Sequence, residues 1–89
     1  MNFEYDQRKS KSNKKKHGID FDEAQVLWDD KYLLKVPSIQ DIGEESRFLY
    51  IGTIGSKHWT AIATDRDLDL IRIISVRRSR KQEVEIYEN

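Results

Sequence analysis

Hydrophobic and polar residues alternate with a period of two in several short runs of the chain, which is typical of half-buried β-strands. The runs predict strands at residues 3–5, 32–36, 47–54, 58–64 and 70–77. A polar loop is expected at residues 38–46, a hairpin turn at 55–57 and a second turn at 65–69. The last three strands therefore predict an antiparallel meander.

Residues 7–17 predict a helix that carries no hydrophobic side chain. Asp6 can cap its first turn, and Gly18 can close its last turn in the left-handed conformation. A helix that is polar on every face is not stable by propensity alone. Two alternatives follow: a solvated basic segment, or a helix docked on the domain through the face that carries Asn13 and His17.

A second helix is indicated by a capping box, in which Asp20 and Glu23 exchange hydrogen bonds with each other's backbone. An apolar stripe at helical spacing follows and ends at residues 29–30. The stripe, which we expect in the core, consists of Phe21, Ala24, Leu27 and Trp28.

The last helix is predicted from a further capping box, formed by Ser79 and Gln82, and should end near Glu88. Its inner face would carry Val84 and Tyr87, which are three residues apart. The element order is then β-α-α-β-β-β-β-α. This order predicts an α+β fold in which a small antiparallel sheet is packed by helices.

The 89 residues are enough for one domain with a modest core, and we expect a single domain over residues 1–89. Charged residues make up 36% of the chain and hydrophobic residues 37%, so the surface is densely charged. The formal net charge is +0, but residues 7–17 and 72–81 are basic and residues 20–45 are mainly acidic. Binding depends on such local patches more than on the net charge.

The chain has no cysteine, which excludes disulfides, thiolate metal sites and cysteine nucleophiles. No apolar run approaches the length of a membrane span, and the sequence does not open with a signal peptide. We therefore expect a cytoplasmic protein that has no membrane partner.

Residues 70–77 join an apolar, β-branched run to a group of cations, with Arg72 inside the run. The cations at the end of the run are Arg77, Arg78, Arg80 and Lys81. Planar guanidinium groups suit phosphate recognition, so the cluster predicts a site for RNA phosphates. The alternative is an interior strand whose basic end pairs with the chain's own acids.

The period of an extended strand limits how these arginines can act together. Arg72 and Arg78 would point to one side, and Arg77 to the other. The three can reach one phosphate only if a bulge or the following turn redirects one of them. Arg66, in the adjoining turn, could join from the neighbouring strand end.

Candidates for a general base are few. His17 and His58 are the side chains of the type that exchanges protons near neutral pH, and His58 is expected to be exposed beside a turn. A lysine with a lowered pKa, either Lys16 or Lys81, is an alternative. Aromatic side chains at positions 50 and 59 could stack on bases, but their alternation with core residues favours packing.

Taken in order, several motifs resemble those of the BrnT family of type II toxins. The resemblance covers nearly the whole chain, and the pair of motifs Lys-His-Gly and Arg-Ile-Ile-Ser-x-Arg at this separation is specific. It rests on Phe3-Glu4-Tyr5-Asp6, Lys9, Asn13, Lys16-His17-Gly18, Phe21, Glu23-Ala24, Arg72-Ile73-Ile74-Ser75, Arg77-Arg78, Glu83 and Tyr87-Glu88. The chain departs at Tyr5, where the family often has tryptophan, and at Gln7, where it often has proline; both changes are tolerable.

The resemblance implies a RelE-like fold and a ribonuclease toxin that cleaves RNA without a metal or other cofactor and inhibits translation. It also implies neutralisation by a BrnA-type antitoxin, with operator DNA bound only through the antitoxin complex. The residues expected to act in catalysis are Arg66, Arg72, Arg77, Arg78 and His17. Those expected to bind RNA are Lys16, Arg80 and Lys81, and the expected product is a 2′,3′-cyclic phosphate.

Two other functions stay open at this point. The scarcity of general bases is compatible with a toxin-derived module that holds an antitoxin or RNA without cleaving it. The segregation of charge is compatible with a structural protein whose basic patches cover its own acidic loop.

Overall fold

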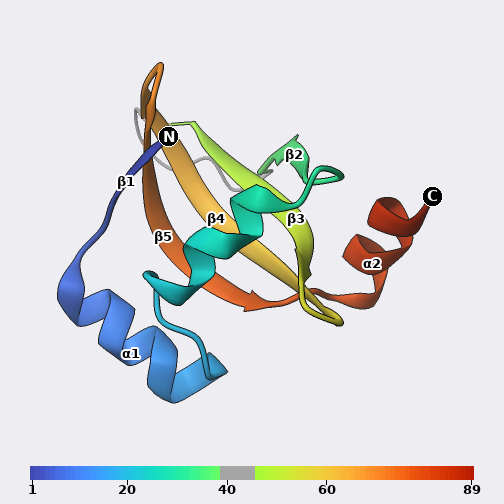
Figure 1. Cartoon of the computed structure of the whole chain (residues 1–89), viewed down its shortest axis with the longest axis horizontal. Coiled ribbons are helices and arrows are strands. Elements are labelled where there is room, and N and C mark those ends of the chain that lie inside the picture. Colours follow the sequence, from blue (N-terminus) through green and yellow to red (C-terminus); the bar gives the residue numbers. More distant parts are fainter. Residues whose placement is uncertain (39–45) are drawn as a thin grey trace.

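The fold is a five-stranded sheet packed by helices in the computed structural model, which describes residues 1–38 and 46–89 (Figure 1). Within these residues the strands are β1 (Asn2–Glu4), β2 (Leu34–Pro37), β3 (Arg47–Ile54), β4 (Lys57–Asp67) and β5 (Leu70–Arg78). They lie in the order β1-β5-β4-β3-β2. The pair β1–β5 is parallel and the other pairs are antiparallel, so the predicted α+β class and meander are confirmed.

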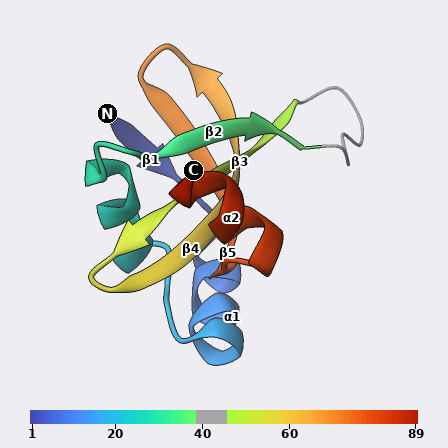
Figure 2. The same ribbon diagram turned by 90° about the vertical axis from the view of Figure 1, so that its right-hand side faces the viewer.

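The helices cover one face and two ends of this sheet. They are α1 (Gln7–His17), the 3₁₀-helix η1 (Glu23–Asp29) and α2 (Lys81–Glu88). The view of Figure 1 shows η1, in teal, lying across one face of the sheet, with α1 below it. Turning the molecule by 90° places α2 in front of the sheet and α1 beneath it (Figure 2). No helix of the described residues is long and apolar enough to cross a membrane.

The element order is as predicted, but three local features differ. The second helix is a 3₁₀-helix closed by bonds such as that from Asp30 N to Leu27 O, although Asp20 and Glu23 do exchange the expected hydrogen bonds. The predicted turn at residues 65–69 is shorter than expected: β4 extends to Asp67, so the turn consists of residues 68–69. The predicted loop at residues 38–46 lies mostly outside the described residues.

The capping box of the last helix lies one residue later in the chain than predicted. Glu83, rather than Gln82, is the residue whose side chain accepts a hydrogen bond at the helix start, from Arg80 N at 2.8 Å. The ion pair with Arg77, described below, stabilises the Glu83 carboxylate at this position. Val84 and Tyr87 are partly buried, as expected of an inner face.

The core lies between the sheet and the pair η1 and α1. Its buried residues are Ile19, Phe21, Ala24, Leu27, Tyr50, Trp59, Ala61, Ala63, Ile71, Ile73 and Val76. The predicted apolar stripe is confirmed at three of its four positions, and Trp28 packs at the edge of the core. Tyr50 and Trp59 are 4% and 8% exposed, which confirms packing as their use. Gly52 allows the close approach of η1, since a Cβ there would lie 3.0 Å from Asp30 Oδ2.

The polar helix α1 is docked on the sheet through two buried polar side chains, Ser10 and Asn13. Asn13 Nδ2 donates to the carbonyl oxygens of Ile19 and Val76 at 2.8 Å each, and Val76 N donates to Asn13 Oδ1 at 3.1 Å. Ser10 Oγ accepts from Phe21 N at 2.9 Å. Asn13 therefore forms hydrogen bonds to the backbone of β5 at Val76, past the part of β5 that pairs with β1. The docked alternative is the correct one, although His17 itself is exposed.

Candidate functional site

A β-bulge in β5 decides which arginines share a face of the sheet. Ile62 of β4 pairs with Ser75 and Ala63 pairs with Ile73, so Ile74 is the extra residue. Because of this shift, Arg72 and Arg77 lie opposite two residues of β4 that share a face, Thr64 and Thr60.

Arg78 lies opposite Trp59 and thus belongs to the other face. Its guanidinium lies 5.5 Å from the centre of the Trp59 ring, and its Nε donates to His58 O at 3.2 Å. The bulge that would redirect one arginine is therefore present, but it brings together two of the three arginines and separates the third.

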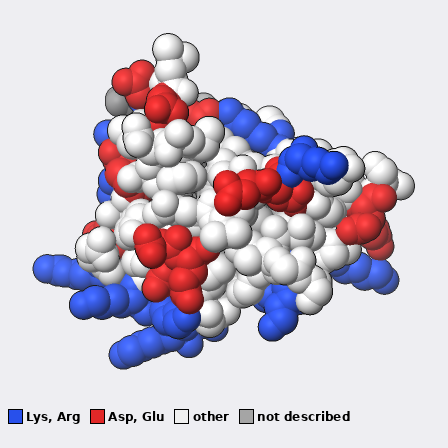
Figure 3. Space-filling model, viewed as in Figure 1, with Lys and Arg blue, Asp and Glu red and all other residues white. Residues whose placement is uncertain are grey.

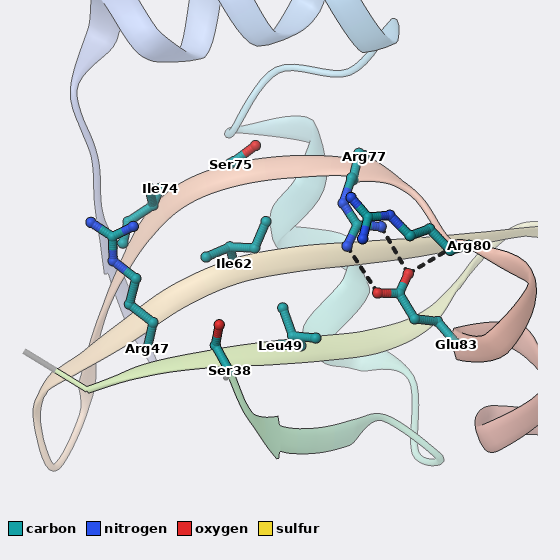
Figure 4. A pocket seen from close by; sticks show the side chains of 9 residues that line it. All are labelled: Ser38, Arg47, Leu49, Ile62, Ile74, Ser75, Arg77, Arg80 and Glu83. Carbon is teal, nitrogen blue, oxygen red and sulfur yellow. Dashed lines mark hydrogen bonds and ion pairs between the residues drawn. The ribbon is translucent and has the colours of Figure 1, made fainter. Parts of the chain in front are cut away.

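A groove, called here the sheet groove, lies on the face of the sheet that points away from η1 (Figure 4). Its volume is about 310 Å³. The lining residues are Ser38, Arg47, Leu49, Ile62, Ile74, Ser75, Arg77, Arg80 and Glu83. Figure 4 shows Arg47 at one end and Arg77, Arg80 and Glu83 at the other, with aliphatic side chains between them.

A second cavity, called here the helix pocket, lies between α1 and β5 and has a volume of about 170 Å³. It is lined by Lys9, Ser12, Asn13, Lys16, His17, Ile74 and Ser75. Ile74 and Ser75 line both cavities, so the two adjoin at the bulge. Cations of α1 therefore line one side of this junction, and Arg77 of β5 and Arg80, which precedes α2, line the other.

Glu83 is the carboxylate at the α2 end of the sheet groove. It accepts a bidentate pair of hydrogen bonds from Arg77, each 2.8 Å long. Further bonds come from Arg80 N and from Thr60 Oγ1, at 2.8 and 2.9 Å. The bonds from Arg77, more than any other contact, lower the pKa of Glu83 to about 2. The carboxylate is therefore charged at neutral pH, and it neutralises Arg77.

A similar arrangement holds the cations at the β1 side of the sheet. Arg72 Nη1 lies 2.9 Å from Glu4 Oε2, and Arg66 Nε lies 3.7 Å from the same oxygen. Arg72, Arg77 and Arg78 therefore do not meet at one phosphate site, although the cluster predicted such a site. Two of these arginines are paired with internal carboxylates, because register and helix docking bring Glu4 and Glu83 beside them.

The other predicted site residues are distributed along the two cavities and beyond them. Lys16 and His17 line the helix pocket and Arg80 lines the sheet groove, whereas Lys81 is exposed at the start of α2 and lines neither. His58 is partly buried rather than exposed. Its Nε2 lies 2.7 Å from Glu88 Oε2, and its ring packs against Tyr87.

Sequence reasoning missed four polar residues of the groove as site residues: Ser38, Arg47, Ser75 and Glu83. Ser75 and Glu83 belong to motifs that carried the family resemblance, but nothing local distinguished the four from solvated polar positions. In residues 1–38 and 46–89 there is no group of three or more histidine, aspartate or glutamate side chains that could hold a metal ion.

A family model described as "Ribonuclease toxin, BrnT, of type II toxin-antitoxin system" matches residues 5–83. The chain belongs to the BrnT family. A solved structure of a BrnT ribonuclease toxin, from Brucella abortus, has the same fold, with a TM-score of 0.69 and 23% sequence identity. The superposition covers 91% of this chain and 99% of the Brucella protein. Comparison with curated protein sequences gives no significant match. The predicted family and fold are thus confirmed, and type II toxin–antitoxin ribonuclease is the function of the family.

Proposed function

We propose that this BrnT-family chain cleaves RNA where the sheet groove meets the helix pocket. The observation that carries the proposal is the sharing of Ile74 and Ser75 by the two cavities. Arg77 and Arg80 line the sheet groove on one side of this junction, and Lys16 and His17 line the helix pocket on the other side.

The chemistry that suits these groups is an internal transesterification. The ribose 2′-oxygen loses its proton to a base and bonds to the phosphorus, while the bond from phosphorus to the 5′-oxygen breaks and that oxygen takes up a proton. The products are a 2′,3′-cyclic phosphate and a free 5′-hydroxyl. Arg77 and Arg80 would stabilise the charge that develops on the phosphorane.

His17 is our candidate for the proton transfers, since it is the one histidine that lines the adjoined cavities in the described part of the chain. Lys16, beside it, is the alternative. The role of Glu83 would be to hold Arg77 in place, because a carboxyl whose pKa lies near 2 is a weak base. Arg66, Arg72, Arg78 and Lys81 line neither cavity. We assign Arg66, Arg72 and Lys81 to contacts with flanking nucleotides, and no RNA contact to Arg78, which lies against Trp59 on the opposite face.

The proposal extends to the cellular role. Cleavage of RNA in the cytoplasm would inhibit translation, and a BrnA-type antitoxin would neutralise the toxin by covering the cationic cavities. Operator DNA would then be bound through the antitoxin.

The test is incubation of the purified protein with RNA in the presence of EDTA, with the products analysed for 2′,3′-cyclic phosphate ends. Arg77→Lys keeps the charge but loses the bidentate geometry, and we expect a rate lowered about 100-fold. Arg78→Lys is the matched control on the opposite face and should retain most of the activity. Intact RNA at a large excess of folded wild-type protein would overturn the proposal.

A second function, RNA or antitoxin binding without cleavage, is favoured by the pairing of Arg77 with Glu83, which leaves less positive charge for a phosphate. It predicts salt-sensitive RNA binding in the same assay, with no new RNA ends and no growth arrest on expression.

A further inference from the structure

α1 carries two separate rows of basic side chains. Lys9 and Lys16 line the helix pocket. Arg8, Lys11 and Lys15 follow one another at spacings of three and four residues, so they form a row of their own. The helical period places this outer row opposite the buried anchors of α1, and its three residues are exposed.

The outer row is free of ion pairs, as judged over residues 1–38 and 46–89. The basic side chain of α1 that does form one is Lys14, with Glu23 at 2.8 Å. Figure 3 shows basic side chains projecting from the α1 end of the molecule. The backbone that carries the row is held firmly, because α1 is capped by Asp6 and hydrogen-bonded to β5 through Asn13.

The chemistry of α1 favours a nucleic acid over a protein as the occupant of this row. The centre of a protein interface is enriched in aromatic residues and depleted in lysine. No residue of α1 is apolar, so the helix has nothing to insert into a partner's pocket. Binding to a phosphate backbone, in contrast, needs only cations that can displace counterions.

We infer that Arg8, Lys11 and Lys15 form a second RNA-binding surface, which holds the phosphate backbone beyond the nucleotides that are cleaved. The inference rests on the proposed function, whose groove begins on the neighbouring face of α1. Because the width of a helix, about 10 Å, separates the two rows and a stacked strand advances about 3.4 Å per nucleotide, a dinucleotide in the groove cannot reach the outer row, whereas a longer RNA can. The preferred substrate is therefore a long or folded RNA.

The experiment compares two RNA lengths with the full chain. Lys11→Gln combined with Lys15→Gln removes two charges and retains helix propensity. For a 40-nucleotide RNA we expect affinity to fall about tenfold at roughly 0.1 M salt, and the slope of log K against log salt to become shallower by about 1.4. Cleavage of a dinucleotide, which cannot span from the groove to the outer row, should be unchanged.

The matched control is Lys31→Gln combined with Lys57→Gln, which removes the same charge from exposed positions outside α1. It should leave the affinity for the long RNA within about twofold of the wild type. Equal losses in the two double variants would reduce the effect to net charge and overturn the inference. An α1 variant that binds the long RNA like the wild type would overturn it as well. So would a variant that loses binding to polyglutamate, a probe for an acidic protein partner, but keeps its affinity for RNA.

The failure of the inference can be told apart from failure of the proposed function. If the wild type leaves both the dinucleotide and the 40-nucleotide RNA intact at high enzyme excess, the cleavage site is wrong. If the wild type cleaves RNA and the double variant also binds the long RNA normally, only the second surface is wrong.

Discussion

Glu83 controls the charge of the sheet groove. Its carboxylate accepts hydrogen bonds from Arg77, Arg80 N and Thr60 Oγ1, and its side chain is only 9% exposed. An ion pair this well bonded orients the guanidinium, but an incoming phosphate must compete with the carboxylate for it. Glu83 therefore both orients Arg77 and reduces the positive charge that Arg77 can offer to a phosphate.

The pKa of Glu83 gives a pH-dependent prediction. Because the pKa is lowered from 4.5 to about 2 by folding, the contribution of the ion pair is fully present above pH 4.5 and is lost as pH falls toward 2. Glu83→Gln should lower the free energy of unfolding at pH 7 by about 3 kcal/mol and nearly match the wild type at pH 2. Denaturant titrations at several pH values measure this.

The control for this prediction is Glu85→Gln, which alters an exposed residue of the same helix. Its stability should track the wild type at each pH. A constant deficit of the Glu83 variant from pH 7 to pH 2 would show that the lost stability comes from packing rather than from the charge.

At the level of elements, α1 illustrates how a helix without an apolar side chain can belong to a folded domain. Asn13 supplies both a donor and an acceptor to Val76 and a donor to Ile19, so it connects α1 to the sheet and to the segment that leads to η1. Since the helix pocket lies between α1 and β5, this one amide supports the geometry of the α1 side of the candidate site.

Asn13→Ala should therefore destabilise the chain by about 2–3 kcal/mol, because buried backbone groups of Val76 and Ile19 would lose their partner. Thermal or chemical unfolding measures the change. Ser12→Ala, an exposed change one residue away on the same helix, should alter stability by less than about 0.5 kcal/mol. An Asn13 variant as stable as the Ser12 variant would mean that α1 is not anchored through the amide.

At the scale of the whole molecule, the N-terminal strand β1 forms one edge of the sheet. β1 pairs in parallel with the start of β5, although the two are separated by most of the chain. The rings of Phe3 and Trp28 pack edge-on with their centres 4.9 Å apart, and Glu4 forms ion pairs with Arg72 and Arg66. Over the whole chain the positive and negative charges cancel, with a formal net charge of +0. Any attraction for RNA would therefore come from local basic patches.

Removal of residues 1–4 should consequently destabilise the whole domain by several kcal/mol, because an aromatic core contact and a strand pairing are lost together. Cooperative unfolding followed by tryptophan fluorescence would reveal a lower midpoint or an unfolded chain. Phe3→Leu, which retains hydrophobic volume, is the control and should recover most of the stability. A truncated chain with the wild-type midpoint would contradict the role given to β1.

The sequence alone determined the class of fold, the order of the elements and the family. These follow from local signals: alternation within strands, Asp6 and Gly18 at the ends of α1, and motifs contiguous along the chain. The extension of β4 past residue 64 was missed because Asp65, Arg66 and Asp67 resemble a turn until β5 pairs with them.

Only the tertiary structure decided which charges remain available for a ligand. The bulge at Ile74 placed Arg72 and Arg77 on one face, the register of β1 brought Glu4 to Arg72, and the docking of α2 brought Glu83 to Arg77. Each of these facts concerns side chains that meet because separate elements pack together. A pattern along the chain states which residues carry charge, but the partner of each charge depends on distances that arise only when the sheet is assembled.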